Sequence, residues 1–230
     1  MKISILMPVY NEIKTIKDVL ELVKAIKLDK EIILVDDYST DGTRELLKKE
    51  YGDGFGEVRV FYHEQNKGKG AAIRTALENA KGEYVIVQDA DMEYSPNDMI
   101  TMTKFAEETG AEAVYGSRFL KTWKTTSFPH FLVNKTLTVL TNILFGGSLT
   151  DMETCYKMVK TDVIRSLNIK AERFEFEPEV SAKLLRKGID IKELPVSYRG
   201  RGYDEGKKIG WRDGVEAVMT IFRLKFSKRF

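Results

Sequence analysis

Two aspartates at the end of an apolar run are the residues of this chain whose types and spacing best suit chemistry. Asp89 and Asp91, one alanine apart, follow the run Tyr84–Gln88. Such a run predicts a buried parallel strand, and ligand sites lie beyond the carboxyl ends of these strands. Two carboxylates there need a cationic partner, and oxygen ligands suit Mg²⁺ or Mn²⁺. The pair therefore predicts a site for a metal ion that would bridge a diphosphate. The simpler interpretation is a solvated acidic turn.

Alternating strands and helices bring further polar residues to the same place. The expected strands of the first half are Ile3–Met7, Glu31–Val35, Val58–Tyr62, the run Tyr84–Gln88 and Ala113–Tyr115, with helices between them. This alternation predicts an α/β protein with a doubly wound, mostly parallel sheet. Since the carboxyl ends of parallel strands share one edge, we expect Pro8–Asn11, Asp36–Asp37 and Asp89–Asp91 to converge on one crevice.

The second half is less regular. It contains an amphipathic helix at Phe128–Phe145, then a strand at Cys155–Val159, a helix at about Glu179–Lys187, a strand over Ile189–Val196 and a final helix from Trp211. Asp151 and Glu153 follow the first of these helices and add a third acidic group. No linker or repeat interrupts the chain, so we expect one domain over residues 1–230.

Composition limits the possible functions. Lysine and arginine total 37 against 35 acidic residues, so nothing in the charge suggests nucleic acid as a partner. A single cysteine, Cys155, fits a reducing compartment. The apolar start ends at Pro8, which predicts a first strand rather than a signal peptide. No stretch reaches the roughly 18 apolar residues that a membrane-spanning helix needs, so the expected location is cytoplasmic.

Four motifs in the first half resemble family 2 glycosyltransferases. They are Met7–Glu12, Val35–Thr43, Asn66–Gly70 and Asp89–Asp91. The resemblance implies a GT-A fold, a nucleotide-sugar donor and an inverting reaction. Later segments, Tyr115–Arg118, Thr150–Thr154 and the loop Tyr198–Lys208, are similar to the branch of dolichyl-phosphate mannose synthases and polyprenyl-phosphate glucosyltransferases. That branch implies transfer of a hexose, from a GDP-mannose or UDP-glucose type donor, to a lipid phosphate.

The resemblance also implies roles for particular residues. Residues 1–120 would bind the nucleotide sugar and residues 121–230 would form the acceptor side. The implied residues are Pro8, Tyr10 and Glu12 in the nucleotide pocket, Asp37 on the base, Lys69 beside the donor, Asp89, Asp91 and Glu93 on Mg²⁺ or Mn²⁺, and Arg118, Asn134 and Arg201 on the acceptor phosphate. Among these, Asp91, Arg118 and Arg201 would act in catalysis, together with Asp151. Asp89 would also face the sugar or ribose of the donor.

Two alternatives concern the acceptor and the activity itself. A lipid phosphate is already an anion and needs no general base, whereas a saccharide hydroxyl needs one. Asp151 is then the first candidate and Glu153 the second. A protein of another class, a non-catalytic nucleotide-sugar-binding protein, would not need the Asp89–Asp91 pair and the two arginines.

Other polar residues have simpler interpretations. The turn Ser39–Gly42 is expected to cap the next helix. Glu175, Glu177 and Glu179 are typical of an acidic helix start, favoured by the helix dipole. For Glu177 the alternative is contact with the site. His63 is expected on the surface, and Cys155 is expected to pack as a small apolar residue.

The final helix predicts a membrane-surface partner. Val215, Val218, Phe222 and Phe226 recur at helical spacing, and basic residues are frequent near the end of the chain. This composition is typical of an interfacial amphipathic helix. We therefore expect a peripheral protein on the cytoplasmic face of the membrane, and a membrane-protein partner is the alternative.

Overall fold

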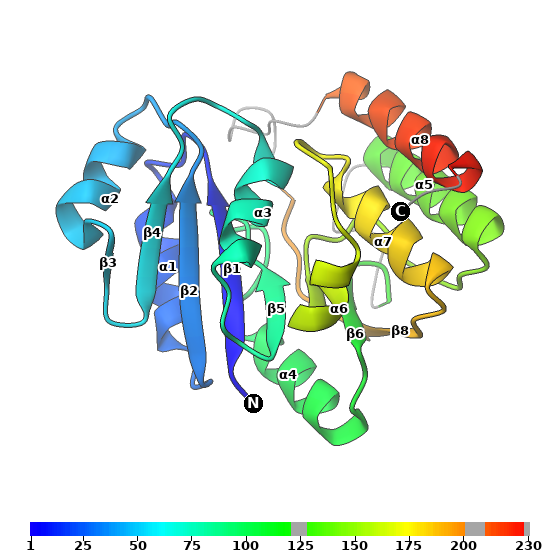
Figure 1. The fold of residues 1–230 in the computed structure, drawn as a ribbon, viewed down its shortest axis with the longest axis horizontal. Coiled ribbons are helices and arrows are strands. Elements are labelled where there is room, and N and C mark those ends of the chain that lie inside the picture. The colour runs from blue at the N-terminus through cyan, green and yellow to red at the C-terminus, as the bar shows by residue number, and fades with distance from the viewer. Residues whose placement is uncertain (121–127, 201–209, 228–230) are drawn as a thin grey trace.

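One mixed sheet organises the protein. The structure is a computed structural model that describes residues 1–120, 128–200 and 210–227. Within these residues, eight strands form a sheet in the order β3-β4-β2-β1-β5-β7-β6-β8. The strands are β1 (Ile3–Val9), β2 (Lys30–Asp36), β3 (Gly54–Phe55), β4 (Val58–Tyr62), β5 (Tyr84–Val87), β6 (Ala113–Ser117), β7 (Lys157–Lys160) and β8 (Ile191–Pro195). Figure 1 shows the strands of this sheet side by side, with helices in front of them and behind them.

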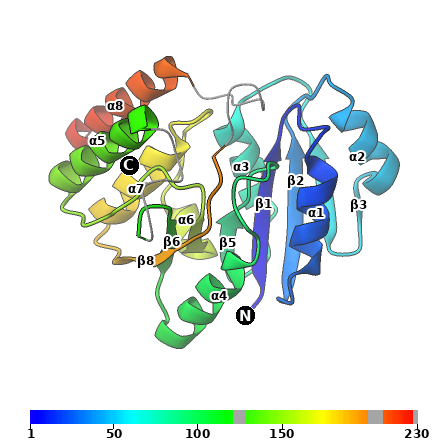
Figure 2. The same ribbon diagram turned by 180° about the vertical axis from the view of Figure 1, so that it is seen from behind.

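Helices cover both faces of this sheet. They are α1 (Ile16–Ala25), α2 (Thr43–Tyr51), α3 (Lys69–Glu78), α4 (Asp98–Thr109), α5 (Phe128–Phe145), α6 (Thr161–Ser166), α7 (Phe176–Arg186) and α8 (Trp211–Phe226). Helices α1 and α3 lie on opposite faces, as the two opposed views in Figures 1 and 2 show. Helices α5, α7 and α8 pack against one another beside the second half of the sheet. No described helix is long and apolar enough to cross a membrane.

The strand directions bring the carboxyl ends of several strands to one edge of the sheet. Strands β1, β2, β4, β5, β6 and β8 run parallel, and β3 and β7 run antiparallel to their neighbours. The expected mostly parallel sheet is therefore confirmed. Because β7 is reversed between β5 and β6, the residues that precede it lie at the same edge as the carboxyl ends of the parallel strands.

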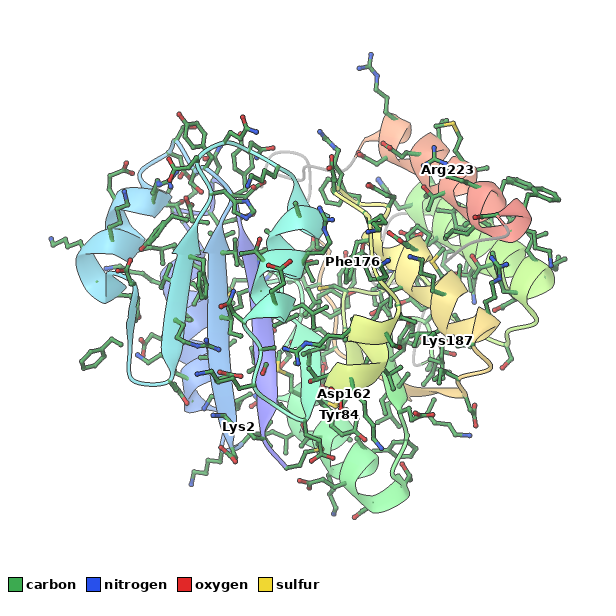
Figure 3. All side chains as sticks on the ribbon, viewed as in Figure 1. Lys2, Tyr84, Asp162, Phe176, Lys187 and Arg223 are labelled. Atoms are coloured by element: carbon green, nitrogen blue, oxygen red, sulfur yellow. The ribbon has the colours of Figure 1, made fainter. Side chains whose placement is uncertain are left out.

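The core lies on both faces of the central strands. Every residue of β2 and β5 is buried, since helices cover both sides, and apolar residues of these strands form the main cluster. Tyr84 of β5 and Phe176 of α7 are fully buried in it (Figure 3). Strand β7 comes from the second half of the chain and pairs with β5 and β6 from the first half. The sheet thus continues across the expected boundary at residue 120.

Some elements differ from the prediction. Helix α7 begins at Phe176 rather than near Glu179, and β7 begins at Lys157 because a turn bond from Lys157 N to the Cys155 carbonyl, 2.8 Å, precedes it. Strand β3 and helix α6 were not predicted, since two and six residues are too short to show a periodic pattern.

Candidate active site

Hydrogen bonds between the loops after β1 and β2 form the first part of the site. Asn11 and Tyr38 both have left-handed backbone conformations, with φ of 51° and 68°, which turn the chain after each strand. Asn11 N donates to Ser39 Oγ at 2.9 Å, and Thr40 N donates to Asn11 Oδ1 at 2.8 Å. Glu12 N donates to Thr43 Oγ1 at 3.0 Å. The two loops are thus fixed to each other, and Tyr10 and Glu12 with them.

The turn Ser39–Gly42 caps α2 as predicted, through Asp41. Asp41 Oδ1 accepts from Thr43 N, at the first residue of α2, at 3.0 Å, although the N-cap residue itself is Gly42. In addition, the Ser39 and Thr43 hydroxyls accept bonds from the loop after β1. A polar turn before a helix can serve both roles, and its sequence indicates only the first.

Asp37, directly after β2, is the centre of a second group of bonds. Its side chain is buried, with the residue 2% exposed. Oδ1 accepts from Lys67 N at 2.8 Å and lies 2.7 Å from His63 Nδ1, and Oδ2 accepts from Gly68 N at 2.7 Å. The carboxylate thereby joins the ends of β2 and β4 to the start of α3.

His63 was predicted on the surface, and this was wrong. It is buried, with Nδ1 on Asp37 and Nε2 2.9 Å from Thr75 Oγ1. A signal was available in the sequence, since His63 directly follows β4 and so lies at the carboxyl edge, where polar residues are candidates for the site.

Lys69, the first residue of α3, connects the aspartate pair to α7. Its Nζ lies 2.9 Å from Asp89 Oδ1 and 3.1 Å from Glu177 Oε1. Burial alone would lower the pKa of Lys69, but the Asp89 and Glu177 carboxylates outweigh it and hold that pKa well above its ordinary value. For Glu177 the first expectation was an acidic helix start and the alternative was contact with the site; the structure places it in contact with the candidate site residue Lys69.

Two glycines allow the turn before α3 to approach the loop 170–173. Gly68 has a φ of 95°, and a Cβ there would collide with the Glu172 carbonyl. A Cβ on Gly70 would lie 2.7 Å from the Ala171 carbonyl oxygen. Ala71 N donates to the Glu172 carbonyl at 3.0 Å across this contact. Lys69 is therefore positioned by close backbone packing on both sides of it.

The other two glutamates of the acidic run hold that loop in place. Glu175 Oε1 accepts from Glu172 N at 2.7 Å, and Glu179 Oε2 accepts from Ala171 N at 2.6 Å. Lys183 lies 2.5 Å from Glu179 and neutralises it. Each glutamate of the run thus has a specific partner, beyond the general effect of the helix dipole.

Asp91 lies at the carboxyl end of β5, almost fully buried. Its Oδ1 accepts from Glu93 N at 3.1 Å. The Glu93 carboxylate instead accepts from the Tyr198 hydroxyl at 3.0 Å. Across residues 1–120, 128–200 and 210–227, no three His, Cys, Asp or Glu side chains are grouped to hold one metal ion. Within these residues the expected third ligand, Glu93, is therefore not grouped with the pair.

Asp89 and Asp91 nevertheless fit a divalent cation that binds together with a diphosphate. Mg²⁺ in proteins is commonly held by one or two carboxylates, with substrate phosphates and waters completing the coordination. Two carboxylates at the end of one strand supply this donor set. The pair would therefore hold the ion only in part and leave the remaining positions to the nucleotide.

Arg118 and Asp151 form a buried ion pair. Arg118 Nε and Nη2 donate to Asp151 Oδ2 and Oδ1, both at 2.7 Å, and Arg118 N donates to Oδ2 at 2.9 Å. Asp151 is 0% exposed and Arg118 is 8% exposed. Burial would lower the pKa of Arg118, but Asp151 outweighs it and holds that pKa well above its ordinary value.

This pair bears on two predicted roles. Both Asp151 oxygens accept from Arg118, so a proton taken by Asp151 would break a buried, bidentate contact. The geometry therefore counts against Asp151 as a general base. Two of the three Arg118 guanidinium nitrogens likewise donate to Asp151. This reduces the number of N–H donors that Arg118 can offer to an acceptor phosphate.

Glu153 has a different environment. Its Oε1 is buried and accepts no hydrogen bond within the described part of the chain. Burial, and then the nearby Glu177 carboxylate, raise the pKa of Glu153 to about 7. This acid can therefore exist in either protonation state near neutral pH. Cys155, two residues on, is buried as predicted.

The remaining predicted residues are less closely connected. Pro8 lies near the end of β1 and Asn134 lies on α5, both half-buried. Arg201 lies outside the described residues. The contacts above join Asp37, Lys69 and Asp89 in one region, and Arg118, Asp151 and Glu93 in a second region linked through Tyr198, whose ring centroid is 5.1 Å from Arg118 Cζ.

Solved structures identify the fold. Glucosyl-3-phosphoglycerate synthase from Mycobacterium tuberculosis, in complex with UDP, matches with a TM-score of 0.72 at 20% identity, over 97% of this chain and 80% of that one. S. aureus TarS, in complex with UDP-GlcNAc, matches with a TM-score of 0.63 at 21% identity, over 97% and 66%. The fold is therefore GT-A, that of a large class of glycosyltransferases.

Sequence comparison adds the family. The family model described as glycosyl transferase family 2 matches residues 4–167, and the chain belongs to this family. A low-salt glycan biosynthesis hexosyltransferase, Agl6, from Haloferax volcanii is 26% identical over 91% of this chain, which spans only 51% of that protein. A UDP-N-acetylglucosamine–dolichyl-phosphate N-acetylglucosaminyltransferase from Methanococcus voltae is 26% identical over 98% of this chain and 97% of its own length. The predicted resemblance is thus confirmed at the level of the family.

Proposed function

We propose that this glycosyltransferase moves a hexose from a nucleotide sugar, of the GDP-mannose or UDP-glucose type, to a polyprenyl or dolichyl phosphate, with inversion at the anomeric carbon. The observation that carries the proposal is the grouping of Asp89, Lys69 and Glu177 beside Asp91 at the carboxyl end of β5. The UDP complexes of structural neighbours and the name of the Methanococcus voltae relative support the donor and the acceptor, respectively.

On the donor side, Pro8, Tyr10 and Glu12 line the nucleotide pocket, and Asp37 accepts from the base. Asp89 and Asp91 would hold Mg²⁺ or Mn²⁺, which would supply positive charge to offset that of the departing diphosphate. Lys69 keeps a fixed positive charge beside the pair, because its pKa is raised and its position is fixed by the turn 66–70.

On the acceptor side, the phosphate is the nucleophile and is already an anion at neutral pH, so no general base is needed. This agrees with the binding of Asp151 to Arg118. Attack on the face opposite the departing diphosphate inverts the anomeric carbon. Arg118, Asn134 and Arg201 remain the proposed acceptor residues, with Arg118 also fixing the segment that carries Glu153.

The outer surface of α5 and α8 supports docking on a membrane. On α5, Leu132, Val139 and Ile143 are exposed, Ile143 by 75%. On α8, the exposed apolar residues are Val215, Met219, Phe222 and Phe226. In both sets, residues lie seven and eleven positions after the first member. Residues at this spacing lie on one face of a helix. The two helices lie side by side in both views (Figures 1 and 2).

This surface replaces the stripe expected from the sequence. Val218 was assigned to the membrane face, but it is half-buried and packs against the core, as do the buried Ala217 and Ile221. Helix α8 therefore has an inner apolar face on α5 and α7 and a separate outer one. Helix α5 contributes to the outer surface as well, which the sequence did not indicate.

Charge favours an anionic surface as the partner. Residues 128–145 and 211–230 contain six basic and two acidic residues, a net charge of +4 in a chain whose total is +2. Arg223, on α8, is exposed (Figure 3). Basic residues near anionic lipid contribute about 1 kcal/mol each. Peripheral attachment to the cytoplasmic face would bring the site to its lipid phosphate, and a membrane-protein partner is the alternative.

A donor and acceptor screen tests the proposal. Radiolabelled GDP-mannose, UDP-glucose and UDP-N-acetylglucosamine are each incubated with a short polyprenyl phosphate and Mg²⁺ or Mn²⁺, and label in the organic phase is measured. We expect one donor to give lipid-linked product. Label that appears only on added saccharides would contradict the lipid acceptor but retain the glycosyltransferase.

One observation favours that second candidate, transfer to a saccharide hydroxyl. Such a reaction needs a general base, and Glu153 has a buried oxygen that accepts no hydrogen bond within the described residues, and a pKa raised to about 7. Glu153 is then a better candidate than Asp151, reversing the order expected from the sequence.

A further inference from the structure

The hydrogen bonds of Asp37 limit what its carboxylate can still accept. An ionised carboxylate has about four acceptor positions, two on each oxygen. Oδ1 faces two donors, His63 Nδ1 and Lys67 N, and Oδ2 faces one, Gly68 N. Counting donors from the described part of the chain, one position therefore remains, on Oδ2. The two backbone donors belong to the turn that begins α3, which is packed against the loop 170–173.

His63 is the side chain that fills the second position on Oδ1. With a carboxylate at Nδ1 and the Thr75 hydroxyl at Nε2, the imidazole donates from Nδ1. Its backbone is fixed as well, since His63 N donates to the Asp36 carbonyl at 2.9 Å and Arg44 Nη2 donates to the His63 carbonyl at 2.9 Å. The contact with Thr75 and the fixed backbone thus both keep the imidazole ring against Asp37.

We propose that Asp37 selects a uridine nucleotide over a guanosine nucleotide, and that His63 is the residue that sets this selectivity. The uracil edge offers one N–H between two carbonyl groups, which matches the single position left on Asp37. The guanine edge offers two adjacent N–H donors, which pair with both oxygens of an open carboxylate. Because Oδ1 is already full, one guanine donor would be left without its partner, at a cost in binding.

This inference rests on the proposed function, in which Asp37 meets the base, and it goes further by naming the nucleotide. The binding of UDP and GDP to the full chain, measured by calorimetry in one buffer containing MgCl₂, tests it. We expect UDP to bind at least about tenfold more tightly, the difference that one lost hydrogen bond of about 1.4 kcal/mol gives.

Two amide substitutions at His63 form a matched pair. In His63→Asn the amide nitrogen can take the place of Nδ1 and donate to Asp37, so the preference for UDP should persist. In His63→Gln the amide reaches the Nε2 position instead, which leaves Oδ1 with an open acceptor position. We expect GDP to bind more tightly relative to UDP in that variant. The preference for UDP, expressed as the ratio of the two dissociation constants, should fall at least about threefold, which corresponds to part of the free energy of one hydrogen bond. Thr75→Val, which leaves the Nδ1 contact in place, should keep the wild-type ratio.

The outcomes separate the inference from the function on which it rests. If wild type binds GDP as tightly as UDP, or if folded His63→Gln keeps the wild-type ratio, the inference is wrong while a nucleotide-sugar donor remains. If folded wild type binds neither nucleotide, the proposed function fails too. Thermal unfolding of each variant establishes that it is folded before its ratio is used.

Discussion

Each acidic side chain at the carboxyl edge of the sheet has a different partner, and that partner decides which chemistry remains open to it. Asp37 is held by a histidine and two backbone amides, Asp89 by a lysine, and Asp151 by a bidentate arginine. Glu153 is the exception, since one of its buried oxygens accepts no hydrogen bond within the described part of the protein. Similar carboxylates thus suit base recognition, metal binding, structure and proton transfer.

Asp91 is the residue whose loss should affect catalysis most. Asp91→Asn removes a charge from the proposed metal site, and we expect turnover to fall at least about a hundredfold, or roughly 2.7 kcal/mol of barrier. Asp190→Asn is a matched control, because Asp190 is an exposed carboxylate paired with Lys192. Activity is measured with Mn²⁺ and with EDTA. Equal activity in both would contradict a metal-assisted reaction.

Glu153 should make stability depend on pH. Its pKa is raised in the folded protein to about 7 from an ordinary 4.5, so the folded state binds the proton more tightly than the unfolded chain. Stability is then lost as the pH rises from about 4.5 to about 7. We expect Glu153→Gln to raise the unfolding temperature by a few °C at pH 8 and little at pH 5. An equal shift at both pH values would contradict the raised pKa.

At the scale of elements, the Arg118–Asp151 pair joins the end of β6 to the segment that leads into β7. Removing one partner of a buried ion pair costs about 3–5 kcal/mol, because a charge is left uncompensated. We therefore expect Asp151→Asn to lower the free energy of unfolding in urea, and activity to fall because less protein is folded. Unchanged stability together with lost activity would instead restore Asp151 as the general base.

The contact between the start of α3 and the loop 170–173 is a second link between elements. Gly68→Ala would place a methyl group against the Glu172 carbonyl in a backbone conformation that alanine adopts poorly. We expect a loss of stability of more than about 1 kcal/mol, with weaker nucleotide binding because Gly68 N also bonds Asp37. Gly146→Ala is the control, since Gly146 has a φ of 74° but open space around it. Similar losses in both variants would mean that backbone strain alone is responsible.

The sequence predicts elements better than it predicts their partners. The strands β1, β2, β4 and β5 were expected within two residues, because strands buried on both faces appear as continuous apolar runs. The reversed direction of β7 could not be expected, since an apolar run carries no direction. Asp89 and Lys69 were both expected at the donor, but the contact of Glu177 with Lys69 and the burial of His63 depend on which loops pack together.

For the whole molecule, the paired outer faces of α5 and α8 predict binding to anionic membranes. Replacing Ile143 and Phe226 together by serine removes exposed apolar surface without opening the core, since Phe226 is 77% exposed. We expect wild type to float with phosphatidylserine vesicles at low salt and the double variant to bind at least about tenfold less, through lost burial of apolar area. Phe55→Ser, on β3, is the control, because Phe55 is equally exposed.

The contradicting outcomes distinguish the possible partners. If wild type does not float with anionic vesicles, the membrane surface is excluded as the direct partner, and a membrane protein or a soluble acceptor becomes the better hypothesis. If Phe55→Ser weakens binding as much as the double variant, the surface of α5 and α8 has no special role.

The position of β7 between β5 and β6 has a consequence for synthesis on the ribosome. Strands β1, β2, β4 and β5 are complete once Val87 has been made, but the outer edge of β5 pairs only with β7, which begins at Lys157. At about 5–20 residues per second, that edge waits several seconds for its partner. An open edge with the apolar sequence Tyr-Val-Ile-Val is a template for pairing with another chain. Strand β5, which leads into the proposed metal ligands Asp89 and Asp91, is therefore open to such pairing until β7 closes the sheet.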